Sequence, residues 1–181
     1  MMWRRPRTRR LRDLAADRSG VAAVEFALLV PVVIVVYLAG FEVMEAATVS
    51  RKLTDTTVQI ANVTSQYTSM GSTDVGNVLG ASSQIMTPYP TGSLSIVLTE
   101  VTVDDSGVGQ LDWSEGYQGG TPLTSAVTMP AGFQTKGDSY ILVQTTYAYQ
   151  PVIGGSFVPP ITMKNQIFML PRSVSMIPYT G

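Results

Sequence analysis

The chain has 181 residues, a formal net charge of −1, and neither Cys nor His. The missing Cys and His exclude thiolate nucleophiles, disulfide frameworks, His-based catalytic triads and nearly every zinc site with customary ligands. The small net charge hides an asymmetry, because residues 1–20 hold seven Arg and two Asp (7 − 2 = +5), whereas residues 21–181 hold five Lys or Arg and eleven Asp or Glu (5 − 11 = −6).

Residues 1–20 form a basic segment directly before an apolar run. The stretch RRPRTRRLR at residues 4–12 has the charge of a phosphate-binding arm. A basic cluster that precedes an apolar span is more simply the cytoplasmic flank that orients the span. We therefore expect a basic cytoplasmic leader over residues 1–20 and no nucleic-acid partner.

Residues 21–41 are long and apolar enough to cross a membrane once. This run of 21 residues measures about 31 Å at about 1.5 Å per residue, close to the roughly 30 Å of a hydrocarbon core. The positive-inside rule places the basic leader in the cytoplasm and the bulk of the chain on the other side. A secretory signal peptide would have a shorter apolar core and a small-residue cleavage site, which the following FEVME does not supply.

Residues 42–70 continue the helix as an amphipathic extension, since no Gly or Pro interrupts them. Apolar or small positions recur at spacings of three and four, with charged and amide side chains between them. These positions are Ala46, Val49, Leu53, Thr56, Ile60, Val63 and Tyr67. We expect this stripe to cover the protein's own sheet, with packing against another subunit's helix as the alternative.

Residues 71–181 are expected to form a β-rich domain, because Gly, Ser, Thr and Pro become frequent from Gly71. The alternation in residues 93–103, followed by DDSGVG and QLDW, predicts a hairpin. Residues 138–151 and 161–170 are rich in β-branched and aromatic side chains and end at prolines, so each predicts a strand. The predicted fold class is α+β: a long N-terminal helix packed on a small antiparallel sheet.

Glu25 is the unusual residue of the apolar run. A charge costs about 2.5–3.5 kcal/mol at the bilayer centre unless it is placed or paired with care. One interpretation is an uncleaved anchor in which Glu25 sits at headgroup depth and pairs with Arg18. The other is an assembly signal, because the residues around Glu25 form a motif.

The segment SGVAAVEF, residues 19–26, resembles the processing site of type IV prepilin-like proteins. It has a basic leader, a glycine, four apolar residues, a glutamate and an apolar helix. The wider chain resembles the TadE/TadG-like minor pilins, or pseudopilins, of the bacterial tight-adherence (Tad, or Flp) pilus system. The stretches that carry this resemblance are RSGVAAVEFALLVPV, VTVDDSGVGQLDWSEGYQGG and YAYQPVIGG.

The resemblance implies a pilin-like fold and a structural role in pilus assembly, with no enzymatic activity and no cofactor or metal. It implies cleavage between Gly20 and Val21 by a membrane aspartic prepilin peptidase, and a role for Glu25 and Phe26 in assembly and register. The implied partners are the major pilin, other pseudopilins, the prepilin peptidase, the inner-membrane assembly platform and membrane lipid. The implied location is the bacterial inner membrane, as a single-pass protein with a periplasmic C-terminal domain that can enter a pilus.

Cleavage would give Glu25 a partner. The α-amine of Val21, with an ordinary pKa of about 7.7–8.0, would appear four residues before the carboxylate. The pair could close within one helix or between neighbouring subunits, and the resemblance implies the second, which would set axial register. An uncleaved bitopic scaffold of the same system is the alternative function.

Three further patterns predict ordinary structural roles. Asp104, Asp105 and Asp112 lie around glycines, but the stretch lacks the spacing and bidentate Glu of an EF-hand loop, so we expect a hairpin turn. We expect the aromatic residues of the strand regions to be core or cross-strand pairs, with a sugar-binding face as the alternative. These are Trp113, Tyr117, Tyr147 and Tyr149.

A membrane-anchored hydrolase is the least favoured function. It would need a Ser–Lys pair based on Lys52, Lys136 or Lys164, or a carboxylate pair such as Asp112 and Glu115. No motif supports either arrangement, so we expect these side chains to be solvated or to serve the fold.

Overall fold

The computed structural model describes residues 19–153, 155 and 159–181, so residues 1–18 of the expected leader lie outside the described residues. Its helices are α2 (Ser19–Thr64) and α3 (Ser72–Ser83), followed by the short 3-10 helices η1 (Gln84–Met86) and η2 (Thr91–Ser93). The strands follow in one block. They are β1 (Leu94–Val103), β2 (Val108–Tyr117), β3 (Val127–Thr128), β4 (Ser139–Tyr149) and β5 (Ile161–Met169).

The chain divides into two compact units, Met1–Val43 and Met44–Gly181, and helix α2 contributes to both. The described part of the first unit is the apolar beginning of α2. The second unit contains the remainder of α2 and all of the other elements.

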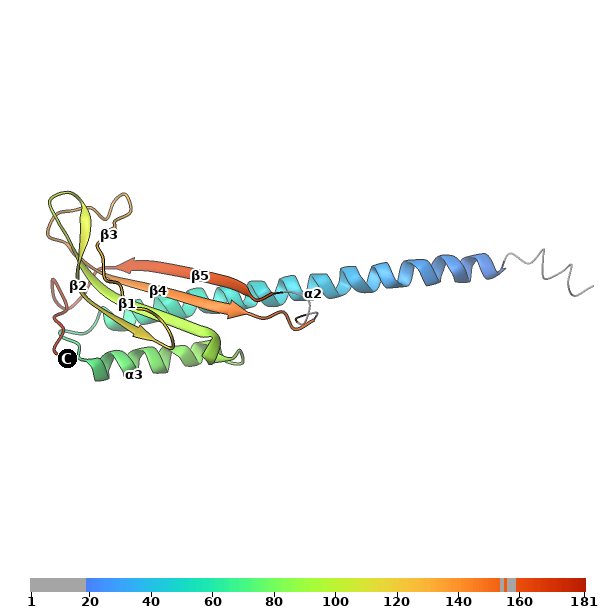
Figure 1. The fold of residues 1–181 in the computed structure, drawn as a ribbon, viewed down its shortest axis with the longest axis horizontal. Coiled ribbons are helices and arrows are strands. Elements are labelled where there is room, and N and C mark those ends of the chain that lie inside the picture. Colours follow the sequence, from blue (N-terminus) through green and yellow to red (C-terminus); the bar gives the residue numbers. More distant parts are fainter. Residues whose placement is uncertain (1–18, 154, 156–158) are drawn as a thin grey trace, which may run out of the picture. The chain divides into compact units, whose positions relative to one another are not determined.

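The second unit is built on one antiparallel sheet with the strand order β3-β2-β1-β4-β5 (Figure 1). Strand β1 lies in the middle and pairs with β2 on one side and β4 on the other, and β4 pairs with β5. The predicted α+β class, a long N-terminal helix packed on an antiparallel sheet, is confirmed. The hairpin predicted after residue 93 is the β1–β2 pair.

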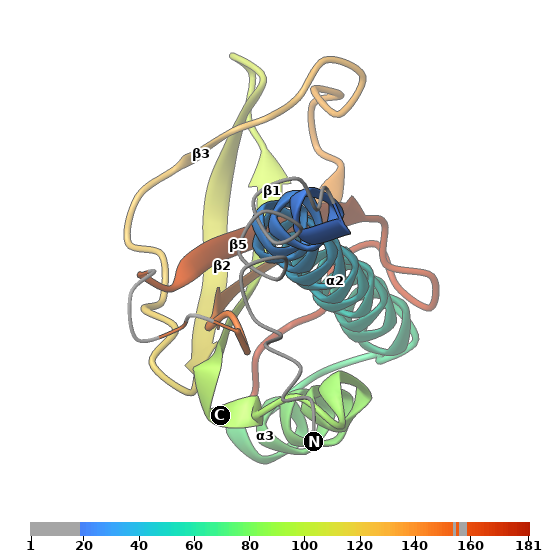
Figure 2. The same cartoon turned by 90° about the vertical axis from the view of Figure 1, so that its right-hand side faces the viewer.

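The main core fills the space between one face of this sheet and the second unit's two helices (Figure 2). Strands β1 and β4 contribute alternate side chains, as expected for a sheet with one covered face. Helix α3 contributes Val75, Val78 and Leu79. The other fully buried side chains include Leu53, Ile60, Leu94, Ile96, Leu98, Ile141, Val143 and Ile177.

A bulge at Asp112 interrupts the pairing of β1 with β2 near a second, smaller core. The pairing shifts between Glu100, which lies opposite Trp113, and Val101, which lies opposite Leu111. Bulges of this kind insert one unpaired residue and re-aim the side chains around it. Strand β1 itself stays regular in its pairing with β4, so its side chains alternate between the two faces. Glu100 lies on the face of the main core, and Val101 lies on the other face in a separate cluster with Met129 and Tyr140.

The predicted stripe on α2 is confirmed in its central part. Val49, Leu53, Thr56 and Ile60 are buried against the sheet, as expected for a helix that covers its own domain. The prediction is wrong at Val63, which is 37% exposed, because the buried face drifts with the 3.6-residue period to Ala61 and Thr64 instead. The helix also ends at Thr64, before the expected boundary at residue 70.

Helix α3 was not expected, since residues from Gly71 onward were predicted to be β-rich. The side chain of Asp74 accepts a hydrogen bond from the Gly71 backbone N–H at 3.0 Å, which satisfies one donor at the start of this helix. Its apolar face is buried in the main core. The β-rich region therefore begins with a helix.

A buried pair of hydroxyls joins α2 to the sheet. The Thr57 hydroxyl lies 2.7 Å from the carbonyl of Leu53 and 2.7 Å from the hydroxyl of Thr145 on β4. The Thr57 hydroxyl uses its proton in the hydrogen bond to the Leu53 carbonyl. The contact between the two hydroxyls is therefore best satisfied when Thr145 donates to Thr57.

We expect Thr57→Val to reduce the free energy of unfolding by about 1–3 kcal/mol, because it leaves the buried Thr145 hydroxyl without its partner. The double variant Thr57→Val/Thr145→Val should recover much of this loss, since it removes both polar groups. Denaturant unfolding of the four chains of this double-mutant cycle provides the test. Equal and additive losses would show that the two hydroxyls do not interact.

Candidate membrane and assembly site

The first unit presents an apolar helical surface. Among the described residues, one helix, α2, is long and apolar enough to cross a membrane, and no residue of the apolar window that qualifies is buried. Large apolar side chains lie all around this part of the helix, which is the pattern of a segment buried in lipid or among other helices. They include Val24, Phe26, Leu28, Leu29, Val32, Val33, Ile34, Val35 and Val36.

The expected processing site lies at the beginning of this helix. Gly20 and Val21 are both exposed, and a Cβ added at Gly20 would meet nothing within 4 Å. Both residues lie in the first turn of α2, so a peptidase that cuts between them must open that turn. The described structure thus leaves this bond free of side-chain contacts.

Glu25 and Phe26 are exposed on the same helix, Phe26 to 69%. Residues 21–25 are all helical, so Val21 and Glu25 lie one turn apart on one face. Pro31 lies inside α2 without ending it, and the apolar helix remains continuous beyond it. The geometry needed for an amine at residue 21 to approach Glu25 is therefore present in the fold.

The aromatic residues considered as a sugar-binding face serve the core instead. Trp113, Tyr147 and Tyr149 are buried, and Tyr117 packs partly buried against the same cluster. The Trp113 indole donates a hydrogen bond to the carbonyl of Ile177 at 2.8 Å. This burial leaves the four rings unable to form an exposed stacking surface.

The acidic stretch after β1 is a hairpin turn, as predicted. The Asp104 carboxylate accepts hydrogen bonds from the backbone N–H groups of Ser106 and Val108 and from the side chains of Ser106 and Gln110. The Ser106 hydroxyl is the largest of several donors that hold the pKa of Asp104 well below its usual range. Asp105 pairs with Lys136 at 2.6 Å, so the acidic side chains are engaged in ordering the turn.

The side chains considered for hydrolysis have structural partners. Lys52 donates to the carbonyls of Ile85 and Thr87, which closes the η1 turn onto α2. Asp112 accepts a hydrogen bond from Thr102. Glu115 accepts one from the hydroxyl of Tyr179. The described structure does not bring these groups together into one site.

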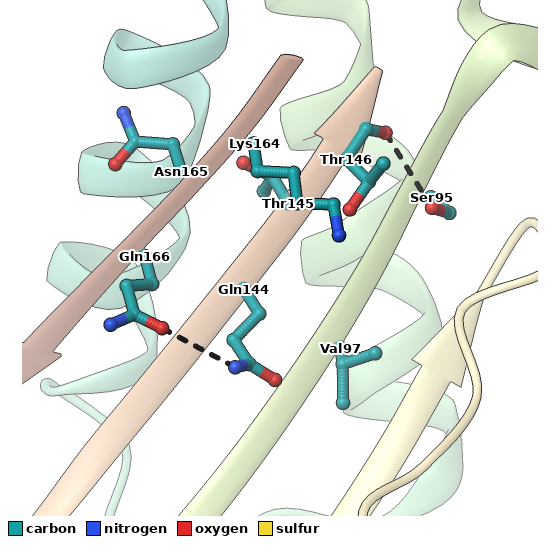
Figure 3. Close-up of a pocket in the computed structure, with 8 residues that line it drawn as sticks. All are labelled: Ser95, Val97, Gln144, Thr145, Thr146, Lys164, Asn165 and Gln166. Carbon is teal, nitrogen blue, oxygen red and sulfur yellow. Dashed lines mark hydrogen bonds between the residues drawn. The ribbon is translucent and has the colours of Figure 1, made fainter. Parts of the chain in front are cut away.

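A shallow polar groove of about 520 Å³ lies on the sheet near the middle of β1, β4 and β5 (Figure 3). Amides, hydroxyls and the ammonium group of Lys164 line it, and Gln144 donates to Gln166 across the strands at 3.4 Å. An antiparallel sheet with one covered face normally presents a polar face of this kind to water. The groove therefore has the character of a solvated surface.

These observations define a class of protein: a chain with one apolar helix suited to membrane anchoring and an α+β unit that has its own core. Residues 20–61 match the family model described as TadE-like protein. The expected TadE-like resemblance is thereby confirmed over residues 20–61. No curated protein and no solved structure gives a significant match to the chain.

Proposed function

We propose that this chain is a minor pilin or pseudopilin that takes part in assembly of a Tad (Flp-type) pilus. In this proposal the helix at residues 21–41 anchors it in the bacterial inner membrane, with residues 1–20 cytoplasmic and the β-rich unit periplasmic. Prepilin peptidase cuts after Gly20, and the mature chain then meets the major pilin, other pseudopilins and the assembly platform.

One observation carries the proposal: the TadE-like match begins at residue 20 and includes the apolar part of α2, residues 21–41, in which Glu25 is the single carboxylate. A carboxylate in such a helix marks function more often than structure, because it is costly to bury in lipid. The exposed apolar surface also fits helix packing in a filament, where similar helices replace lipid as neighbours.

Glu25 then has a defined role. After cleavage, the new α-amine of Val21 and the Glu25 carboxylate can pair between neighbouring subunits and set their axial register. Opposite charges about 4 Å apart attract by about 4 kcal/mol at an effective dielectric of 20, from which desolvation must be subtracted. Phe26, beside this pair, contributes apolar contact to the next helix.

The first test is the N-terminal residue of the protein purified from membranes of a host that contains a prepilin peptidase. We expect mass spectrometry to find a chain that begins at Val21. A chain that still begins at Met1 or Met2 would contradict processing and favour the uncleaved bitopic scaffold. In that case the TadE-like segment acts as a permanent signal anchor.

Gly20→Val should block this cleavage, because it fills the position directly before the expected cut, and the protein in the membrane fraction should run at full length. The matched control is Gly40→Val, since Gly40 lies on the same helix, is also exposed and has nothing within 4 Å of an added Cβ. We expect the control to be processed like the wild type. Equal mobility of wild type and Gly20→Val would argue against a cut at this bond.

A further inference from the structure

A segment that follows β5 closes one end of the second unit. We call residues 171–181 the strap. Its backbone pairs with the stretch after α2, because Met70 donates to the Pro178 carbonyl at 3.1 Å and Thr180 donates to the Met70 carbonyl at 2.9 Å. The Tyr179 ring stacks on Trp113 with centroids 5.5 Å apart. The strap is thus attached to both the helical layer and the sheet.

Ile177 is the centre of the strap, and Glu100 of β1 holds it. The Ile177 side chain is fully buried in the main core. Its backbone N–H donates to Oε1 of Glu100 at 3.1 Å, and its carbonyl accepts from Trp113 at 2.8 Å. Both backbone groups of this irregular residue are therefore satisfied by side chains of the sheet.

The Glu100 carboxyl is itself fully buried, and only one of its oxygens is used. Oε2 has no hydrogen-bond partner among the described residues. Burial is the largest influence on this group and raises its pKa to about 7, although the Ile177 N–H favours the charged form. A buried carboxylate without a countercharge is costly, because its charge has lost the water around it.

The charge of a neighbouring carboxylate opposes ionisation of Glu100. Asp112 on β2 raises the pKa of Glu100 further. The elements packed at this end also carry Glu115 on β2, Asp74 at the start of α3, and Arg172 and Tyr179 in the strap. Glu115 is engaged with Tyr179, and Asp74 with the backbone of Gly71.

We propose that Glu100 is a proton-dependent latch for the strap: the protonated carboxyl keeps the strap closed, and ionisation favours a state in which the strap lifts and water reaches the carboxylate. The latch lies wholly within the second unit and does not depend on the proposed pilus function.

The direction of the pH dependence follows from the raised pKa. The pKa of Glu100 is taken as its ordinary 4.5 when the strap is open and is about 7 when the strap is closed. At pH values between these two, the closed state therefore binds more protons than the open state. The closed state is therefore fully favoured below about pH 4.5 and loses stability as the pH rises toward 7. Opening should increase by on the order of 10- to 100-fold between pH 5 and pH 7 and then level off.

The test is hydrogen exchange of the full-length protein in lipid nanodiscs, measured by mass spectrometry between pH 5 and pH 8. Rates are divided by the intrinsic exchange rate at each pH, so that only protection remains. In the wild type, we expect protection of the peptide covering the strap to fall on the order of 10- to 100-fold between pH 5 and pH 7. In Glu100→Gln, which keeps an acceptor for Ile177 but cannot ionise, protection of the strap should not change with pH.

A control variant and a control peptide test whether the effect is specific to Glu100 and to the strap. Glu115→Gln removes a carboxyl that also touches the strap, through Tyr179, and should keep the wild-type pH dependence. The peptide of β4 should keep its protection while the strap loses it. The latch is refuted if strap protection in the wild type is flat with pH, if Glu100→Gln responds as the wild type does, or if β4 follows the strap, which would indicate a change in global stability.

Discussion

Replacing Glu25 by Gln is expected to leave the protein in the membrane and cut after Gly20, while abolishing its contribution to pilus assembly. The substitution keeps the shape of the side chain and removes its charge, so the α-amine of Val21 loses its partner. A pair of this kind attracts by several kcal/mol in a partly desolvated site. The proposed docking step loses whatever part of this attraction remains after desolvation, whereas membrane insertion does not depend on the pair.

The measurement compares membrane and sheared-surface fractions by immunoblot and counts pili by electron microscopy. Glu42→Gln is the matched control, because it removes a carboxylate from the same helix beyond the apolar run. We expect the control to assemble normally and Glu25→Asp to restore assembly only in part. Normal piliation in Glu25→Gln would instead support a carboxylate that merely sits at headgroup depth.

Gly120→Ala is expected to destabilise the second unit strongly, although it adds only one methyl group. A Cβ at residue 120 would collide with the backbone of Ile96 in β1, and a Cβ at Gly116 would collide with the backbone of Gly120. Both obstacles are main-chain atoms that cannot rotate away. Overpacking of this kind costs about 1–3 kcal/mol, and more where the backbone cannot move.

Unfolding by denaturant can be followed by the fluorescence of buried Trp113 in detergent, with Trp3 replaced by Phe in every variant. The control is Gly76→Ala, since Gly76 lies in α3 with nothing within 4 Å of an added Cβ. It should increase stability by about 0.5–1 kcal/mol, because Ala favours a helix over Gly. Two substitutions of identical size should therefore change stability in opposite directions. If Gly120→Ala unfolds at the same denaturant concentration as the wild type, the result contradicts a steric collision between a Cβ at residue 120 and the Ile96 backbone.

Periodicity predicted the parts of the fold in which local pattern and tertiary packing agree. The spacing of Val49, Leu53 and Ile60 indicated which face of α2 is covered, and alternation located β1. The β-branched and aromatic composition before a proline located β4 and β5. The exposed apolar beginning of α2 and the motif at residues 19–26 located the candidate assembly site. In α2 and the strands, the same residues carry both the local preference and the buried contacts.

Helix α3 could not be predicted in the same way. Its sequence, STDVGNVLGASS, contains two Gly and several Ser and Thr, which are poor helix formers. Val75, Val78 and Leu79 stabilise the helix only when the sheet is present to cover them. Tertiary packing here overrides local propensity, and a single sequence does not show where that packing will come from.

The burial of Glu100 was not predicted, because a charged side chain is rarely buried, although alternation places residue 100 on the same face as Leu94, Ile96 and Leu98. Alternation assigned Leu94, Ile96 and Leu98 to the core but left the choice between Val101 and Val103 open. The structure puts both valines in the second cluster and gives Glu100 the position that faces the main core. The bulge that turns β2 at Asp112, and the irregular strap that covers the carboxyl, have no periodic signature.

The spread of the main core along the chain has a consequence for synthesis. Val49 and Ile177 belong to the same buried cluster, so the cluster cannot close until both have left the ribosome. At about 5–20 residues per second, the roughly 130 residues between them take on the order of 6–25 seconds to translate. During that interval the apolar stripe of α2 has no sheet to cover it. The nascent chain is then most exposed to aggregation and to proteases, and a holding chaperone should increase its yield most if it binds the stripe before β4 has been made.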